Sequence, residues 1–183
     1  AVADGATVST GGQALSITAD DLNLNTTGAL NSGAALTTLI DSDNTGIGLG
    51  ATAVAGGLNV TGAELQQITA TGLTLQTGGN ITVDGITAAN SNNISGTTTL
   101  TANGAASAIT FATAASTFNA LAANATDRVA VNVGVTTDVG NLALDGDANN
   151  AANTNDDLTI AGGVTLASAG SLTLDATTGG IKP

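Results

Sequence analysis

The sequence predicts an all-β protein, a parallel β-solenoid whose short strands are joined by glycine- and asparagine-rich turns. The chain is 42% hydrophobic but only 1% aromatic, with Phe111 and Phe118 as its only rings. Small aliphatic side chains must therefore fill a thin core between closely spaced β-layers. The 25 glycines favour frequent turns. Residues with strong helix propensity, such as Lys, Arg, Glu and Met, are nearly missing.

Short strands are indicated by a triplet that recurs along the whole chain: an aliphatic residue, a small or polar residue, and a second aliphatic residue. The alternation places both aliphatic side chains on one face and the middle side chain on the other, as in a half-buried strand. The triplets are Leu15–Ile17, Leu22–Leu24, Leu58–Val60, Leu73–Leu75, Ile81–Val83, Val131–Val133, Leu142–Leu144, Leu158–Ile160, Val164–Leu166 and Leu172–Leu174.

Turn signals lie between the triplets, at Thr10–Gly12, Thr77–Asn80, Ala161–Gly163 and Thr178–Gly180. No unit between two turns is large enough to bury its own apolar face, so the units must stack, with neighbouring strands about 4.8 Å apart. With about 20 residues in a coil, the chain would form roughly nine coils. We expect residues 1–183 to form a single repetitive domain.

An antiparallel fold is the alternative, because Asp-Gly and Asn-Gly dipeptides also suit hairpins. It would be a pilin-like β-sandwich that donates residues 6–10 or 14–18 to the next subunit. Residues 113–124 fit a short helix and a strand-bearing coil equally well. The polar run 145–157 predicts an exposed loop. Thr61–Glu64 matches a helix capping box, although we expect a turn between coils there.

The charge balance argues against several function classes. The net charge is −12, and Arg128 and Lys182 are the only cations. A surface without a basic patch repels nucleic acid, and no apolar run approaches the ~20 residues of a spanning helix. We therefore expect neither a nucleic-acid partner nor membrane insertion. With no His, no Cys and two cations, the chain is not expected to be an enzyme.

One acidic turn spaces oxygen ligands as hard-cation loops do, at Asp145, Asp147 and Asn149. A structural calcium ion is the ligand that this spacing would suit, but no bidentate Glu follows at the right offset, so a solvated acidic turn is the favoured interpretation. No other cofactor is expected.

Residues 58–85, with Leu73-Thr74-Leu75 and Ile81-Thr82-Val83, resemble repeats of filamentous-haemagglutinin-like bacterial exoproteins, a type of β-strand-repeat surface protein. Gly46–Gly50 fits the same pattern, which is clearest over 22–85 and recurs more loosely over 158–181. The resemblance implies a right-handed parallel β-helix, secreted to an extracellular or cell-surface location. It also implies a role in adhesion, biofilm cohesion or surface fibres.

The expected function follows from shape. Stacked coils form a stiff rod, and unblocked strand edges at its ends invite another copy. We expect a self-assembling structural protein, a homopolymer that forms or contributes to an extracellular filament or adhesive fibre. Two alternatives stay open: a pilin-like subunit joined by a donated strand, and a monomeric adhesin module that binds calcium or a surface glycan through residues 145–157.

Overall fold

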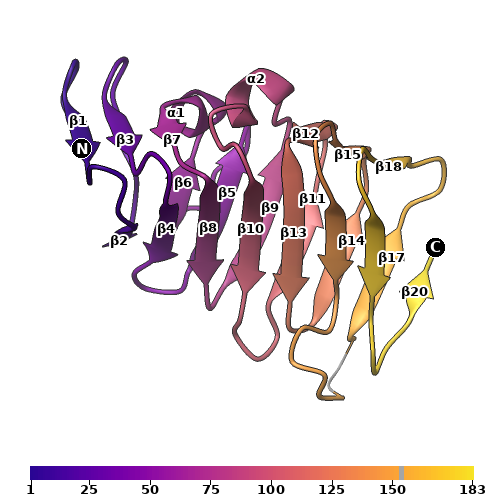
Figure 1. The fold of residues 1–183 in the computed structure, drawn as a ribbon. Helices are drawn as coiled ribbons and strands as arrows, with labels where there is room; N and C mark the ends of the chain where they lie inside the picture. Colours follow the sequence, from indigo (N-terminus) through magenta and orange to yellow (C-terminus); the bar gives the residue numbers. More distant parts are fainter. Residues whose placement is uncertain (153–154) are drawn as a thin grey trace.

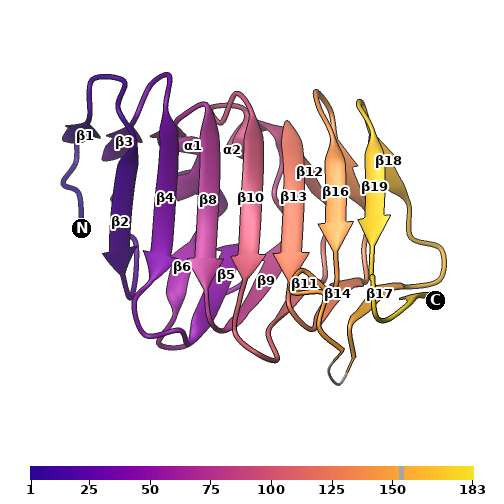
Figure 2. The same cartoon turned by 60° about the horizontal axis from the view of Figure 1, so that its bottom comes forward.

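The computed structural model describes residues 1–152 and 155–183. Strands make up 46% of the described residues and helices 5%. The chain winds into a parallel β-helix with its termini at opposite ends (Figure 1). In Figure 2 the nearer strands all point downwards while successive coils advance from the N-terminus towards the C-terminus, and the chain returns behind them. The helix is therefore right-handed.

Two seven-stranded sheets form the long sides of the β-helix. Sheet 1 contains, from the N-terminal end, β2 (Leu15–Ala19), β4 (Leu36–Asp41), β8 (Gly72–Thr77), β10 (Thr97–Ala102), β13 (Ala120–Ala125), β16 (Leu142–Asp145) and β19 (Leu172–Asp175). Sheet 2 contains β6 (Leu58–Val60), β5 (Gly46–Gly50), β9 (Asn80–Asp84), β11 (Ala108–Phe111), β14 (Arg128–Val131), β17 (Asp157–Ile160) and β20 (Ile181–Lys182).

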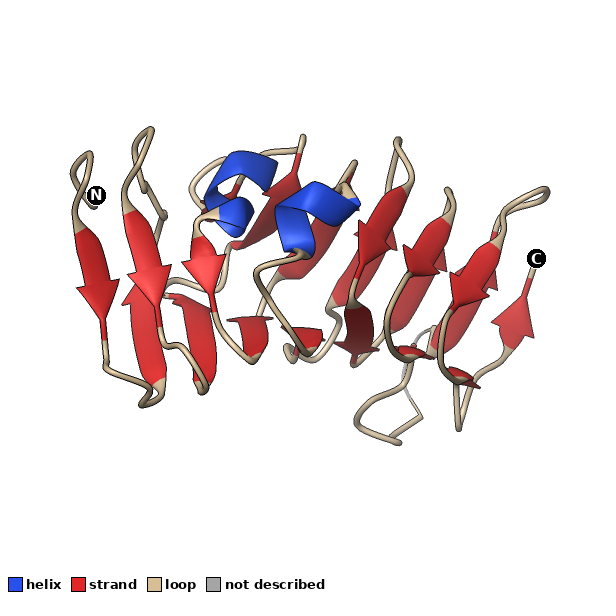
Figure 3. Ribbon diagram, turned by 45° about the horizontal axis from the view of Figure 1, so that its top comes forward, coloured by secondary structure: helices blue, strands red, loops and turns tan. Residues whose placement is uncertain are grey.

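The third side is built from shorter pieces. Sheet 3 contains β1 (Thr7–Ser9), β3 (Ala29–Asn31) and β7 (Ile68–Thr69), and sheet 4 contains β12 (Ser116–Phe118), β15 (Val135–Thr137) and β18 (Leu166–Ser168). Two short helices, α1 (Gly62–Gln66) and α2 (Ala88–Ser91), lie next to each other between these sheets (Figure 3). No helix among the described residues is both long and apolar enough to cross a membrane.

Every strand pairing in the described residues is parallel. This confirms the predicted parallel β-helix and excludes the antiparallel β-sandwich. The coils are longer than the expected length of about 20 residues, and they are unequal in length. Leu121 pairs with Leu142, 21 positions later, whereas Thr37 pairs with Leu73, 36 positions later. The expectation of nine 20-residue coils is wrong, because loops and helices inserted at the corners lengthen individual coils.

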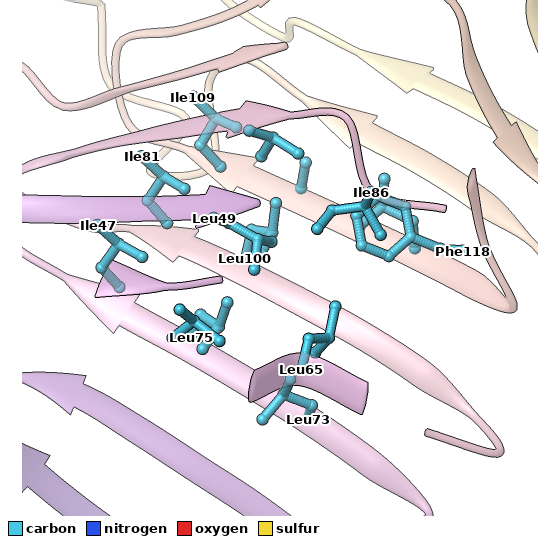
Figure 4. Close-up of a cluster of buried hydrophobic side chains, with 14 of the residues drawn as sticks. Ile47, Leu49, Leu65, Leu73, Leu75, Ile81, Ile86, Leu100, Ile109 and Phe118 are labelled. Carbon is cyan, nitrogen blue, oxygen red and sulfur yellow. The ribbon is translucent and has the colours of Figure 1, made fainter. Parts of the chain in front are cut away.

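The core is a set of aliphatic ladders that run along the axis. In sheet 1, Leu39 pairs with Leu75 and Leu75 with Leu100. In sheet 2, Ile47 pairs with Ile81 and Ile81 with Ile109. These six side chains are at most 1% exposed. Figure 4 shows Leu75 and Leu100 of sheet 1 across the core from Ile47, Ile81 and Ile109 of sheet 2. Each ladder step buries apolar surface between neighbouring coils, which stabilises the stack.

The Ala-rich segment 113–124, for which the sequence fitted a short helix and a strand-bearing coil equally well, is a strand-bearing coil. β12 and the first residues of β13 occupy it. Phe111 and Phe118 are fully buried in the core, so their large rings fill the space that alanines leave. Inward packing of Phe118 therefore outweighs the helical preference of the alanines.

Candidate functional site

The predicted calcium ligands lie at the corner between β16 and β17, and their side chains face different partners. Asp145 Oδ1 accepts from the Asp147 N–H at 2.9 Å, and Asn149 Oδ1 accepts from the Ala151 N–H at 3.0 Å. Asp147 Oδ2 accepts from the Thr178 N–H at 2.6 Å. Two of the three side chains thus stabilise their own turn, as Asp and Asn do in loops.

The burial of this corner is mixed. Asp147 is 1% exposed, whereas Asn149 is exposed. Among the described residues, no group of three or more His, Cys, Asp or Glu side chains is arranged to hold a metal ion. Asn153 and Thr154, which belong to the predicted exposed loop 145–157, lie outside the described residues. The calcium assignment stays a prediction.

Two acidic turns have perturbed carboxyl groups. Burial raises the pKa of Asp145, and the negative charges of Asp175 and Asp147 add to the rise, while the hydrogen bond from the Asp147 N–H opposes it. Hydrogen bonds from the backbone and side chain of Thr45 lower the pKa of Asp43, which is solvent-exposed. The two turns therefore respond to pH in opposite directions.

A groove of about 420 Å³ opens on sheet 2 near the N-terminal end. It arises from the position of β6. This strand follows β5 in the chain, yet it pairs in parallel with the side of β5 that faces the N-terminal end of the β-helix. β6 thereby separates β5 from residues 21–25, which come one coil earlier and form no strand. The groove is lined by Asp21, Leu22, Asn23, Asn25, Ala53, Asn59, Thr61, Ala63 and Glu64.

The far wall of the groove is formed by β6 and the start of α1, and it contains the capping box of that helix. The Thr61 side chain accepts from the Glu64 N–H, and Glu64 Oε2 accepts from the Thr61 N–H at 2.9 Å. Our expectation of a turn there is wrong, because Leu65 of α1 is fully buried in the core and stabilises the short helix (Figure 4). Glu64 Oε1 also accepts from the Leu24 N–H at 3.3 Å, which links the two walls.

Sequence reasoning singled out several groove residues separately, in the triplets Leu22–Leu24 and Leu58–Val60 and in the capping-box match Thr61–Glu64, but it did not bring them together in one groove. The triplet Leu22–Leu24 indicated that Asn23 faces outwards. It contained no signal that β6 would lie beside this segment, because the 36-residue coil looks in the sequence like ordinary strand and turn.

Together, the four parallel sheets, the stacked ladders and the polar groove of the described residues define a parallel β-helix protein with a candidate ligand groove. No protein-family model, curated protein or solved structure matches the chain. The resemblance to filamentous-haemagglutinin-like repeats therefore stays a prediction from the residues.

Proposed function

We propose that this protein is a secreted structural subunit of an extracellular filament or adhesive surface fibre, with copies stacked head to tail through their sheet edges. The observation that supports the proposal is that sheet 1 ends in an edge strand without a further partner strand, among the described residues, at both ends of the β-helix: β2 at the N-terminal end and β19 at the C-terminal end. An edge strand has a row of unpaired N–H and C=O groups that another chain can pair with.

At the C-terminal end the edge strands are β18, β19 and β20, which have no further partner strand among the described residues. This end is also apolar. Leu172 is 45% exposed and Ile181 is 54% exposed, although equivalent positions one coil earlier, Leu142 and Leu158, are fully buried. One more coil would bury these side chains.

The N-terminal end offers the matching surfaces. β2 ends sheet 1 and β1 ends sheet 3. Val8 of β1 is 40% exposed, and Leu15 and Ile17 of β2 are half-buried. Because all strands of sheet 1 run in the same direction, moving a second copy along the axis places its β2 parallel to β19 of the first.

The register of the proposed joint follows from continuing the leucine ladder of sheet 1, in which Leu142 pairs with Leu172 and Leu144 with Leu174. Leu172 and Leu174 would stack on Leu15 and Ile17, and the outward Thr173 would lie beside Ser16. The contact uses different surfaces on the two copies, so it generates an open fibre rather than a closed dimer. A net charge of −12 opposes association, so added salt, which screens the repulsion, should promote assembly.

The test combines imaging with cross-linking. Negative-stain microscopy of the purified chain should show fibres. A mixture of the Ser16→Cys and Thr173→Cys variants should form a disulfide-linked heterodimer on oxidation, because parallel neighbours lie within the usual Cα separation of a disulfide. The chain has no native cysteine to interfere. The matched control mixes Thr173→Cys with Thr74→Cys instead of Ser16→Cys, because Thr74 lies on the outward face in the middle of sheet 1.

Three results would contradict the proposal: discrete particles at every salt concentration, equal cross-linking by Thr74→Cys, or a heterodimer that forms only in denaturant. Discrete particles whose melting temperature rises with calcium would instead support an adhesin module that uses Asp145, Asp147 and Asn149.

A further inference from the structure

The groove beside β6 is separate from the edge strands that the proposed joint uses. The Val2 N–H donates to the Asn23 carbonyl at 2.7 Å, and Asn25 Nδ2 donates to the Val2 carbonyl at 3.0 Å. The first residues of the chain therefore lie along the N-terminal side of segment 21–25, while the groove lies on its other side, between that segment and β6. A ligand in the groove would not need the end-to-end joint.

The near wall of the groove, formed by segment 21–25, carries polar atoms that are available to a ligand. Within the described part of the chain, the Asp21 carboxylate, Asn23 Nδ2 and Asn25 Oδ1 make no hydrogen bond. Each asparagine uses its other side-chain atom in a hydrogen bond within the protein. Asn23 Oδ1 accepts from the Asn25 N–H at 2.9 Å, and Asn25 Nδ2 donates to the Val2 carbonyl. The near wall thus offers mainly acceptors, with one amide donor group.

The side chains of the far wall are already held in place, so a ligand would lose little binding free energy to ordering them. Asn59 Oδ1 accepts from the Val54 N–H at 2.7 Å, and its Nδ2 donates to the Gly57 carbonyl at 2.9 Å. Glu64 is held by Thr61 and by the Leu24 N–H. Side chains fixed by such bonds before a ligand arrives lose less conformational entropy on binding.

We infer that this groove binds a short uncharged saccharide. A wall rich in free acceptors matches a ligand that presents several hydroxyl donors close together. The carboxylates of Asp21 and Glu64, in a chain of net charge −12, repel anionic ligands. Leu22, Ala53 and Ala63 provide apolar contact for the C–H faces of a sugar ring. The groove volume lies within the range of about 300–1,000 Å³ that is usual for ligand sites.

Isothermal titration of the whole chain with cellobiose, maltose and N,N′-diacetylchitobiose tests the inference, with digalacturonic acid as an anionic comparison. We expect at least one neutral disaccharide to bind with a dissociation constant on the order of 1 mM, since no aromatic ring lines the groove. Asp21→Ala and Asn25→Ala should each weaken that binding by about tenfold, because each removes the acceptors of one wall position.

Asp138→Ala is the matched control, because it removes an exposed carboxylate elsewhere and should leave the dissociation constant unchanged. The inference is overturned if no neutral disaccharide binds, if digalacturonic acid binds more tightly, or if Asp21→Ala and Asp138→Ala behave alike. Preferential binding of a lysine-rich peptide would also overturn it. Microscopy of the same preparations separates the two proposals: fibres without saccharide binding contradict only this inference, and saccharide binding by discrete particles contradicts only the filament.

Discussion

The hydroxyl of Thr77 donates to the carboxylate of Asp41 at 2.7 Å, across the boundary between two coils. Asp41 ends β4 and is 1% exposed, and its Oδ2 atom also accepts from the Gly46 N–H at 2.8 Å. Thr77 ends β8 in the next coil, where its hydroxyl accepts from the Gly79 N–H. Two corners that lie 36 residues apart in sequence are thus held together by one buried carboxylate.

Thr77→Val should lower the free energy of unfolding by about 2 kcal/mol, because it removes a hydrogen bond to a buried charged group. Urea unfolding followed by circular dichroism measures this change. Thr74→Val is the control, since Thr74 lies on the outward face of the same strand, and its effect should stay within about 0.5 kcal/mol. Equal effects of the two substitutions would contradict the role of the Thr77 hydroxyl.

Phe118→Ala should destabilise the protein by about 3–5 kcal/mol, because Phe118 is fully buried and alanine would leave a cavity. Val139→Ala provides the comparison. Val139 is 67% exposed, so its truncation should change stability by no more than about 0.5 kcal/mol. Thermal unfolding of both variants checks the difference, and a small effect of Phe118→Ala would mean that its ring does not fill the core.

Two glycines at turns should respond differently to alanine. A Cβ on Gly104 would overlap the carbonyl oxygen of Gly78 in the preceding coil, whereas a Cβ on Gly162 meets nothing within 4 Å. Gly104→Ala should cost about 1–3 kcal/mol through this overlap. Gly162→Ala should be neutral or stabilising by up to about 1 kcal/mol, because it restricts the unfolded chain. Loss of stability in both variants would show that close approach of coils is not the cause.

Asp145→Asn should stabilise the protein at neutral pH. Because the pKa of Asp145 is raised in the folded state, its ionised form costs stability, and that cost is relieved as pH falls through the folded pKa. Asparagine keeps the Oδ1 acceptor for the Asp147 N–H, so the turn should survive. Melting temperatures of both proteins between about pH 3 and pH 7 should therefore converge at the acidic end.

Asp43→Asn tests the sign of the same reasoning. The pKa of Asp43 is lowered, so its carboxylate contributes stability above its unfolded pKa, and that contribution is lost as pH falls. The substitution should therefore lower the melting temperature at neutral pH, opposite to Asp145→Asn. A shift of the same sign in both variants would contradict the assigned causes.

Most strands were predictable because alternation is a local property. Leu58–Val60 coincides with β6, and Leu73–Leu75 and Ile81–Val83 lie inside β8 and β9. The triplet Leu22–Leu24 shows the limit of this signal. Both leucines are buried as predicted, yet the segment forms no strand, because β6 lies between it and β5 of the next coil.

The lengths of the coils and the position of the groove could not be predicted, because both depend on how distant strands pair. Pairing depends on which corner loops are long, and this is decided by tertiary contacts such as those of Leu65 in α1. Inward threonines were also missed. Thr37 is fully buried and donates to Ser32 Oγ at 2.9 Å, so a residue type expected on the outer face occupies a ladder position where a corner supplies its partner.

The scarcity of cations has a consequence for resistance to proteolysis. A protease that cleaves after basic residues finds only Arg128 and Lys182, and the bond after Lys182 leads to proline, which such enzymes cut poorly. Arg128 starts β14, whose neighbours β11 and β17 pair with it on both sides. Digestion must therefore wait until that coil opens, so the intact chain should outlast less regular proteins in a trypsin-rich environment.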